Sequence, residues 1–181
     1  RSRKEALSAA EKFGYPLALK VVGPLHKSDV GGVVLNIKTR NHLLSEFKRL
    51  IKIKDSTGVL IQPMMKGTEL FIGAKYEPTF GHVVLCGLGG IFIEVLKDVS
   101  SGLAPLTMDE ALSMIRSTRS YKIIQGTRGQ VGVDENRFAS IIVRLSTMLR
   151  FATEIKELDF NPLIGKEKEI FVVDARLRIE K

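Results

Sequence analysis

Polar and apolar residues alternate near the C-terminal end of the chain, so in an extended strand the polar members share one face: Glu157, Asp159 and Asn161. Pro162 ends the run, and a second apolar segment, Ile170 to Ala175, is expected to pair with it and bring Asp174 nearby. A few hard oxygen ligands facing one way suit Mg²⁺ that bridges nucleotide phosphates. An exposed acidic face of an antiparallel sheet would show the same pattern.

A second group of chemically suited residues surrounds a glycine-containing loop near the N-terminus. Leu17 to Val22 and Val33 to Ile37 are predicted strands, with Lys20 in the first of them. The connecting loop contains His26 and ends in the pair Gly31-Gly32. Glycine lets backbone N–H groups approach an anion closely, and a lysine supplies positive charge, so the loop could fold over phosphate. An ordinary hairpin with a solvated tip fits these residues equally well.

Three further segments carry residues that stand out from their surroundings. The predicted strand Val59 to Gln62 runs into Pro63-Met64-Met65, a plausible hinge whose soft methionines could enclose a flat ring or simply fill a core. In the predicted strand Thr68 to Tyr76, Glu69 is the single acid, and it shares a face with Phe71 and Gly73, opposite Leu70, Ile72 and Ala74. The tetrad Gly126 to Gly129 presents an arginine, which suits an anion, although solvent-facing loops often contain such tetrads.

Helices and further strands must position these residues. Apolar residues recur at helical spacing in the segments 1–13, 40–51, 108–116 and 135–149, and Thr39, Thr107 and Asp134 are the expected N-caps of the last three. We expect Met108, Leu112 and Ile115 to face inward in the third helix, and Phe138, Ile141, Ile142, Leu145, Met148 and Leu149 in the fourth. His82 to Leu88, the pair Gly89-Gly90 and Ile91 to Leu96 are interpreted as a strand, a turn and a second buried strand.

Composition places the chain among ordinary globular proteins. It has 181 residues, of which 44% are hydrophobic and 27% charged, and no apolar run approaches the length of a membrane span. The single cysteine, Cys86, lies in an apolar run and is expected to be buried and inert, as suits a reducing cytoplasm. A net charge of +8 permits a nucleic-acid partner, but the basic residues are scattered and no aromatic residues are interleaved with them to stack on bases.

The order of these segments resembles the ATP-grasp subunit or domain of the nucleoside-diphosphate-forming acyl-CoA synthetases. The resemblance covers essentially the whole chain and is carried by LALKVVGPLHKSDVGGV, GVLIQPMMKGTELFIGAKY, FGHVVLCGLGGIFIEVLKDV, APL, GTRG, ELDFNPLI and VVDAR. It is nearest to the beta subunit of ADP-forming acetyl-CoA synthetase, a relative of succinyl-CoA synthetase. The implied fold is α+β, with two lobes of antiparallel sheet flanked by helices and the nucleotide between them, here residues 1–62 and 63–181. Because the chain begins on a helix, we expect the first lobe to lack its first element.

The resemblance also implies a role for each candidate residue. Lys20 contacts the nucleotide phosphates, the Gly31-Gly32 loop covers them, Gln62 and Met64 face adenine, and Glu69 lies near the ribose. Asp159, Asn161 and Asp174 match or neighbour the magnesium ligands of the family. His26 takes the phosphoryl group from ATP and passes it to a mobile phosphohistidine segment, and imidazole is nucleophilic enough for this step at neutral pH. Gly102 stands where the family usually has an arginine, which removes a cation that could help to hold phosphate.

The implied activity is a reversible one: acyl-CoA, ADP and phosphate exchange with acid, CoA and ATP. It requires ATP or ADP, Mg²⁺ and a CoA-binding alpha subunit or domain that carries a second phosphohistidine, in a cytoplasmic hetero-oligomer without nucleic acid or membrane. Two other hypotheses remain open at this point. One is a non-catalytic regulatory ATP-grasp module of a larger acyl-CoA synthetase-like protein or protein acetyltransferase. The other is a basic nucleic-acid-binding protein, whose affinity would fall steeply with salt.

Overall fold

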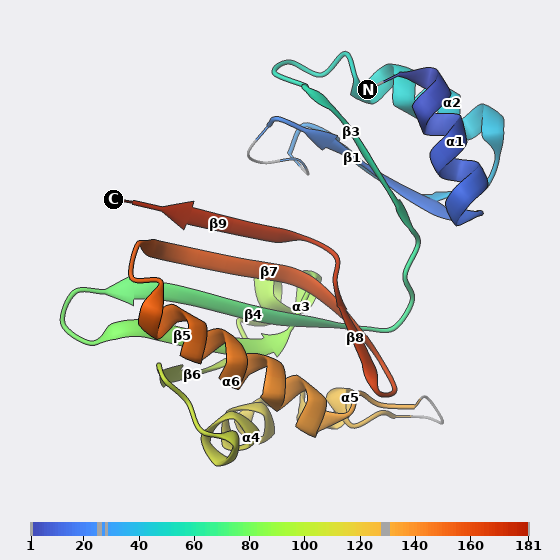
Figure 1. Ribbon diagram of the computed structural model, residues 1–181. Coiled ribbons are helices and arrows are strands. Elements are labelled where there is room, and N and C mark those ends of the chain that lie inside the picture. Colours follow the sequence, from blue (N-terminus) through green and yellow to red (C-terminus); the bar gives the residue numbers. More distant parts are fainter. Residues whose placement is uncertain (1, 25–26, 28, 128–130, 181) are drawn as a thin grey trace. The chain divides into compact units, whose positions relative to one another are not determined.

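The computed structural model describes residues 2–24, 27, 29–127 and 131–180 (Figure 1). The chain divides into two compact units, Arg1–Met65 and Lys66–Lys181. Each unit is an antiparallel sheet with helices packed against it. The division falls just after the predicted hinge segment, three residues beyond Gln62.

The first unit contains two helices and three strands. Helix α1 (Arg3–Phe13) starts at a capping box in which Ser2 and Glu5 satisfy each other's backbone N–H groups, and α2 (Arg40–Leu50) is capped by the Thr39 side chain as predicted. The sheet has the order β2 (Val33–Ile37), β1 (Leu17–Val22) and β3 (Gly58–Pro63). The cap of α2 was predicted from the sequence, whereas the capping box of α1 was not.

The central strand β1 is buried on both faces. Leu17, Leu19 and Val21 belong to the core formed with the helices. Ala18 and Lys20 alternate with them and therefore lie on the opposite face, where Lys20 is only 5% exposed. A lysine is rarely buried to this extent, so its environment distinguishes it from the many surface lysines of the chain.

The second unit is built on a six-stranded sheet. Its strands follow the order β6 (Val99–Leu103), β5 (Gly81–Leu88), β4 (Thr68–Glu77), β7 (Ile155–Lys166) and β8 (Glu169–Val172), with β9 (Ala175–Ile179) paired to the first half of β7. The long strand β7 thus carries two shorter strands along one edge. This arrangement places the connection between β8 and β9, which contains Asp174, beside the middle of β7 (Figure 1).

Helices α4 (Met108–Ser117), α5 (Tyr121–Ile124) and α6 (Glu135–Phe151) complete the second core. Thr107 and Asp134 are the N-caps of α4 and α6, as predicted. Alternate residues of β4 contribute Leu70, Ile72 and Ala74 to this core. Met108 and Met148 were expected to be inside but are 38% and 43% exposed, because each lies at the margin of its helical apolar stripe.

The segment after Gly89-Gly90 is a helix, which corrects the predicted strand. Helix α3 covers Ile91–Leu96 and follows Gly90, whose φ is 60°. The free edge of β5 is taken instead by β6, with pairs such as Val84–Gly102 and Cys86–Ser100. A six-residue apolar run does not distinguish a strand from a short helix, so strand pairing decided the outcome.

Two further features of the sheet were not predicted. β9 is an additional strand, and Gly102 is a paired residue of β6 whose added Cβ would lie 2.8 Å from both Leu106 and Met114 atoms. Position 102 is therefore packed against the core in this chain. Among the described helices none is long and apolar enough to cross a membrane.

Candidate functional site

The predicted metal ligands on β7 lie where the strand is irregular. Phe160 pairs with Ile72, and Leu163 pairs with Leu70, but two residues of β7, Asn161 and Pro162, oppose the single residue Phe71 of β4. This is a β-bulge, a local irregularity that redirects side chains and often occurs beside functional sites. The strict alternation expected from the sequence therefore holds as far as Asp159 and Phe160 and is interrupted at Asn161.

Asp174 lies next to this bulge. Its backbone N–H donates to the carbonyl of Pro162 at 3.4 Å, and the N–H of Val173 donates to the same carbonyl at 3.1 Å. The charge of Asp174 also raises the pKa of Asp159, so the two carboxylates are close enough to interact. The fold therefore brings together Asp159 and Asn161 of β7 and Asp174 of the β8–β9 connection.

The electrostatics of Asp159 suit a cation. Burial is the largest cause of its raised pKa, the Arg176 guanidinium on the paired strand β9 acts in the opposite direction, and Asp174 raises the pKa further. The buried Oδ1 of Asp159 has no hydrogen-bond partner among the described residues. Two carboxylates and one amide oxygen are hard donors, and Mg²⁺ needs only a few of them because it retains water. The described residues contain no group of three or more His, Cys, Asp or Glu arranged for a metal, and this set has only two carboxylates beside its amide.

Glu157 belongs to the same face but not to this group. Its carboxylate pairs with Arg178 of β9 at 2.9 Å, and both side chains are about half exposed. An exposed pair of this kind contributes little to stability. Because its carboxylate is paired with Arg178, Glu157 is not counted among the metal ligands.

Glu69, the predicted ribose contact, lies at the start of β4 beside the Gly89-Gly90 turn. Gly89 donates its N–H to the Glu69 carbonyl at 2.9 Å, and Gly90 donates to Oδ1 of Asn161 at 3.1 Å. A cavity of about 520 Å³ adjoins Glu69 and includes Lys66, Thr68 and Lys166 in its wall. Within the second unit, the predicted ribose contact and the predicted metal ligand Asn161 are thus linked through one turn.

Lys20 and Gln62 share one face in the first unit. Ala18 pairs with Gln62 and Lys20 with Leu60, so all of these side chains lie on the face opposite the helices. Oε1 of Gln62 is buried and has no hydrogen-bond partner among the described residues. Met64 is half-buried just after β3, where its N–H donates to the Pro16 carbonyl at 3.0 Å. A buried amide oxygen without a donor is suited to accept a hydrogen bond from a ligand.

Gly31 and Gly32, in the loop between β1 and β2, occupy positions where a larger residue would be strained or would clash. Gly31 has a φ of 61°, and a Cβ added to Gly32 would lie 2.7 Å from the Lys27 carbonyl and 2.4 Å from a Val21 methyl. The N–H of Gly32 already donates to the Lys27 carbonyl at 2.7 Å. His26 is outside the described residues, as is Arg128 of the second glycine loop.

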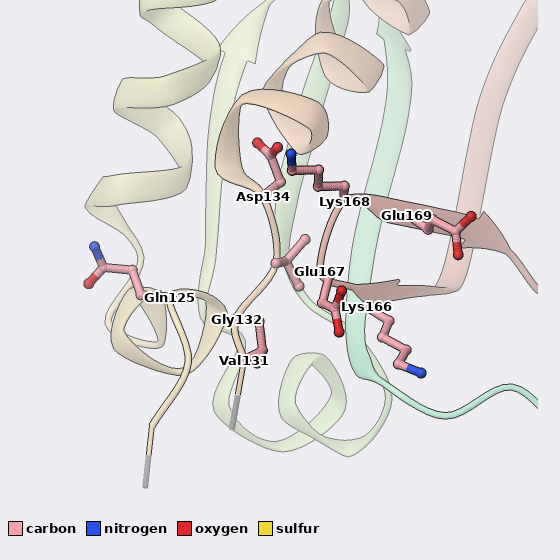
Figure 2. A pocket seen from close by; sticks show the side chains of 9 residues that line it. Gln125, Val131, Gly132, Asp134, Lys166, Glu167, Lys168 and Glu169 are labelled. Atoms are coloured by element: carbon pink, nitrogen blue, oxygen red, sulfur yellow. The ribbon is translucent and has the colours of Figure 1, made fainter. Parts of the chain in front are cut away.

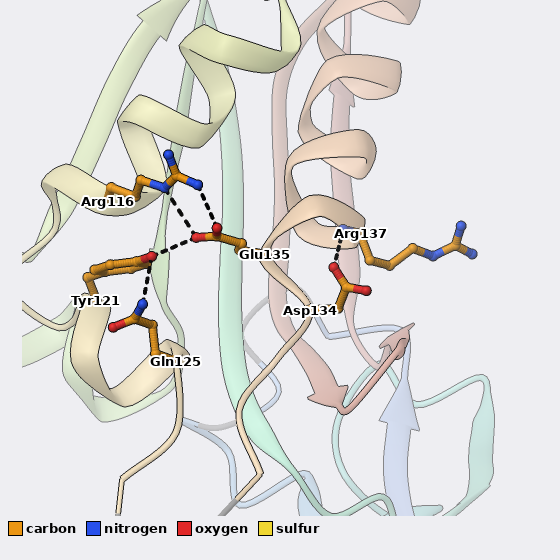
Figure 3. Close-up of polar contacts among 6 residues, drawn as sticks. All are labelled: Arg116, Tyr121, Gln125, Asp134, Glu135 and Arg137. Carbon is orange, nitrogen blue, oxygen red and sulfur yellow. Dashed lines mark hydrogen bonds and ion pairs between the residues drawn. The ribbon is translucent and has the colours of Figure 1, made fainter.

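A polar network that the sequence did not reveal fastens α5 to the start of α6 (Figure 3). The Glu135 carboxylate accepts hydrogen bonds from Arg116 at 2.6 and 3.3 Å and from the Tyr121 hydroxyl at 2.7 Å, and Gln125 donates to that hydroxyl at 2.9 Å. These residues come from three helices and the end of α5, and they form no motif in the sequence, so the sequence analysis did not identify them.

The same region borders a second cavity, of about 730 Å³ (Figure 2). One side is formed by Gln125 and the residues from Val131 to Asp134, and the other by the β7–β8 turn, Lys166 to Glu169. Asp134 donates its N–H to the Glu167 carbonyl at 2.8 Å, which joins the two sides at one end. Its lining carries charges of both signs, so it does not by itself favour an anion or a cation.

Comparison with known proteins defines the class. Residues 1–179 match the ATP-grasp domain family, and the chain belongs to this family. A curated relative, the beta subunit of ADP-forming acetate–CoA ligase I from Pyrococcus furiosus, is 40% identical over 187 residues, covering 98% of this chain and 81% of the relative. The ADP-forming 4-hydroxybutyrate–CoA ligase of Nitrosopumilus maritimus is 43% identical over 178 residues, covering 93% of this chain but only 26% of that protein.

A solved structure shows the same fold. Dinucleotide-forming acetyl-coenzyme A synthetase 1 of Ca. Korarchaeum cryptofilum, in complex with coenzyme A, Ca-AMPCP and HgCl⁺, superposes with a TM-score of 0.92 at 36% identity. The match covers 99% of this chain and 83% of that one. The α+β ATP-grasp fold implied by the sequence motifs is confirmed.

Proposed function

We propose that this chain is the nucleotide-binding subunit or domain of an ADP-forming acyl-CoA synthetase, with acetyl-CoA as the leading substrate class. The observation that carries the proposal is the cluster of Asp159, Asn161 and Asp174, in a chain whose relatives are ADP-forming acyl-CoA ligases. The orphaned oxygen of Asp159 supports a cation at this cluster. A bound Mg²⁺ would supply positive charge that neutralises the phosphates during transfer.

In this proposal each of the other candidate residues contacts one part of the nucleotide. In the first unit, Lys20 contacts the phosphates, the Gly31-Gly32 backbone covers them, and Gln62 and Met64 contact adenine. In the second, Glu69 accepts a hydrogen bond from the ribose. The buried position of Lys20 and the unpartnered amide oxygen of Gln62 support these roles, because both side chains lie on one face of their sheet.

His26 is the proposed phosphoryl acceptor. Its ring nitrogen attacks the γ-phosphorus of ATP, the bond from that phosphorus to the bridging oxygen breaks, and ADP leaves while the ring proton passes to solvent. The phosphoryl group then moves to a histidine of an alpha-type subunit or domain that binds CoA. The relatives from Pyrococcus furiosus that are named beta subunits support a hetero-oligomer, and the single-chain ligases support the same parts joined in one chain. With nucleotide and CoA as co-substrates, we propose the cytoplasm as the compartment.

Phosphoryl transfer from labelled ATP tests the proposal directly. The chain, mixed with an alpha-type partner, should incorporate ³²P from [γ-³²P]ATP in a Mg²⁺-dependent manner, and the label should be acid-labile and base-stable as expected for phosphohistidine. His26→Ala should abolish labelling of both chains, while His42→Ala, on a surface helix, should not. Nucleotide binding without any labelling would instead support the regulatory module.

A further inference from the structure

We propose that the Gly89-Gly90 turn is a positioning element that couples the ribose contact to the metal ligand set, with Gly90 as its central residue. This inference rests on the proposed function, since it assigns a role to residues that hold Glu69 and Asn161. The turn joins the end of β5 to α3 and touches both of these residues directly. No chemistry was assigned to either glycine from the sequence.

The carboxylate of Glu69 lies directly against Gly90, so a side chain at position 90 would displace it. A Cβ on Gly90 would be 1.9 Å from Oε2 of Glu69, well inside van der Waals contact. Gly90 also has φ 60° and ψ −141°, a backbone conformation that L side chains rarely adopt. Gly89 contacts the backbone of Glu69, because it donates its N–H to the Glu69 carbonyl. The turn therefore fixes the backbone of Glu69 and leaves the space that its carboxylate occupies.

Asn161 is oriented by the same turn. The backbone N–H of Gly90 donates to Oδ1, so the amide cannot rotate by 180° without placing its own NH₂ against that N–H. An amide oxygen has two lone pairs, which leaves one for a cation. A Cβ on Gly89 would be 3.1 Å from Oδ1 and 2.7 Å from the Leu70 carbonyl, so this residue also must be small.

The coupling has a consequence for binding. A cation bound to Oδ1 of Asn161 would polarise the amide and alter its hydrogen bond from the Gly90 N–H. A ribose bound to the Glu69 carboxylate would act on Gly90 from its other side. Bound Mg²⁺ should therefore increase the affinity for nucleotide, and bound nucleotide should increase the affinity for Mg²⁺. A turn that only connects β5 to α3 would be insensitive to both.

NMR of the unsubstituted chain tests this without disturbing the fold. The ¹⁵N–¹H resonance of Gly90 is expected to shift when ADP is added and to shift again when Mg²⁺ is added to the ADP-bound chain. The resonance of Gly81, at the far end of β5, is expected to stay in place. Binding of Mg²⁺-ADP that leaves the Gly90 resonance unmoved would overturn the inference while leaving the proposed function intact. A chain that binds no Mg²⁺-nucleotide contradicts both.

A pair of glycine substitutions gives the matched comparison. Gly90→Ala should weaken binding of a fluorescent ADP analogue with Mg²⁺ by about tenfold or more, as is typical when a residue that orients a ligand group is lost. Gly81→Ala has a similar backbone cost at φ 79°, but its Cβ would meet nothing within 4 Å, so it should bind as the unsubstituted chain does. Equal affinities in the two variants would contradict the proposal.

Substitution of Asn161 supplies a test that does not depend on the folding of Gly90→Ala. Asn161→Asp keeps an oxygen that accepts the Gly90 N–H and should retain Mg²⁺-dependent nucleotide binding. Asn161→Ala removes the acceptor and should lose the dependence on Mg²⁺. Retention of that dependence in Asn161→Ala would count against the assignment.

Discussion

Asp159 is the residue at which stability and function oppose each other. Its carboxylate is partly buried, lies near a second carboxylate and has an oxygen without a hydrogen-bond partner among the described residues. A charged group in such surroundings costs free energy unless a cation or donor compensates it. Arg176 supplies part of that compensation. The remainder is what a divalent cation would provide.

Replacement of this carboxylate should separate the two effects. Asp159→Asn removes the buried charge, so we expect the chain without metal to unfold at the same or a higher temperature, and we expect Mg²⁺-dependent nucleotide binding to weaken by at least about tenfold. Thermal unfolding and a Mg²⁺ titration measure these two results. Glu157→Gln, on the same face but paired with Arg178, is the control and should change neither. A loss of stability with unchanged Mg²⁺ binding would contradict this account.

The raised pKa of Asp159 also sets a pH dependence. The folded state takes up a proton more readily than the unfolded state does, so this residue's contribution to stability improves as pH falls through its folded pKa. Bound Mg²⁺ competes with that proton. Affinity for Mg²⁺ should therefore fall as the pH is lowered through the same range and be constant near neutral pH, as isothermal titration calorimetry at several pH values would show. An affinity that rises on acidification would be inconsistent with Asp159 as a ligand.

Helix α5 is held by side chains rather than by its own length. It spans only four residues, Tyr121–Ile124, which is too short to be stable alone. Glu135, at the start of α6, binds Arg116 of α4 and Tyr121 of α5 together. These hydrogen bonds from Arg116 and Tyr121 lower the pKa of Glu135. The network thus stabilises α5 and the residues that lead from it to α6.

Neutralising Glu135 should loosen this group of helices. Glu135→Gln is expected to lower the free energy of unfolding by about 1 kcal/mol, the scale of a charge-assisted pair that is only partly exposed. Because the folded pKa of Glu135 is lowered, this stabilisation is present at neutral pH and is lost as pH falls through that pKa. Urea unfolding at neutral and acidic pH measures it. Glu77→Gln, which breaks the more exposed Lys75–Glu77 pair, should have a smaller effect.

The two units of the molecule have separate cores. Among the described residues, nine buried ones form the first core, around Leu17, Leu19 and Phe47, and a larger cluster around Ile72, Ile115 and Phe138 forms the second. The single cysteine of the chain belongs to the second core, where it is fully buried, and burial raises the pKa of its thiol to about 12. The predicted burial of Cys86 is confirmed, and its low reactivity stays a prediction. Its reactivity can therefore report on the second unit alone.

Labelling of Cys86 should follow unfolding of Lys66–Lys181. In native buffer at neutral pH a disulfide reagent such as DTNB should react over hours or more, and in denaturant within seconds, because a buried protonated thiol is a poor nucleophile. The urea midpoint of labelling should agree with the loss of sheet signal in circular dichroism. Rapid reaction of the native chain would contradict the burial of Cys86.

Local signals in the sequence were sufficient for most elements. The caps at Thr39, Thr107 and Asp134, the alternation in β4 and the buried face of α6 each depend on residues close together in the chain, where side-chain chemistry and backbone geometry are directly linked. Gly31 and Gly32 likewise show a positive φ and a close backbone approach, which glycine allows. The family also followed from the sequence, because several long motifs occur in order.

Features that depend on contacts between segments remote in the sequence could be seen only in the tertiary structure. Ile91–Leu96 could have been a strand, and became α3 because β6 occupies the edge of β5. The bulge at Asn161 exists only in the pairing of β7 with β4, and Gly90 matters only because β5 ends beside Glu69 and Asn161. Residue types along the chain thus determined which groups are available for chemistry. Strand pairing decided which of them meet, since contacts between remote segments depend on the packing of the whole unit and not on local propensity.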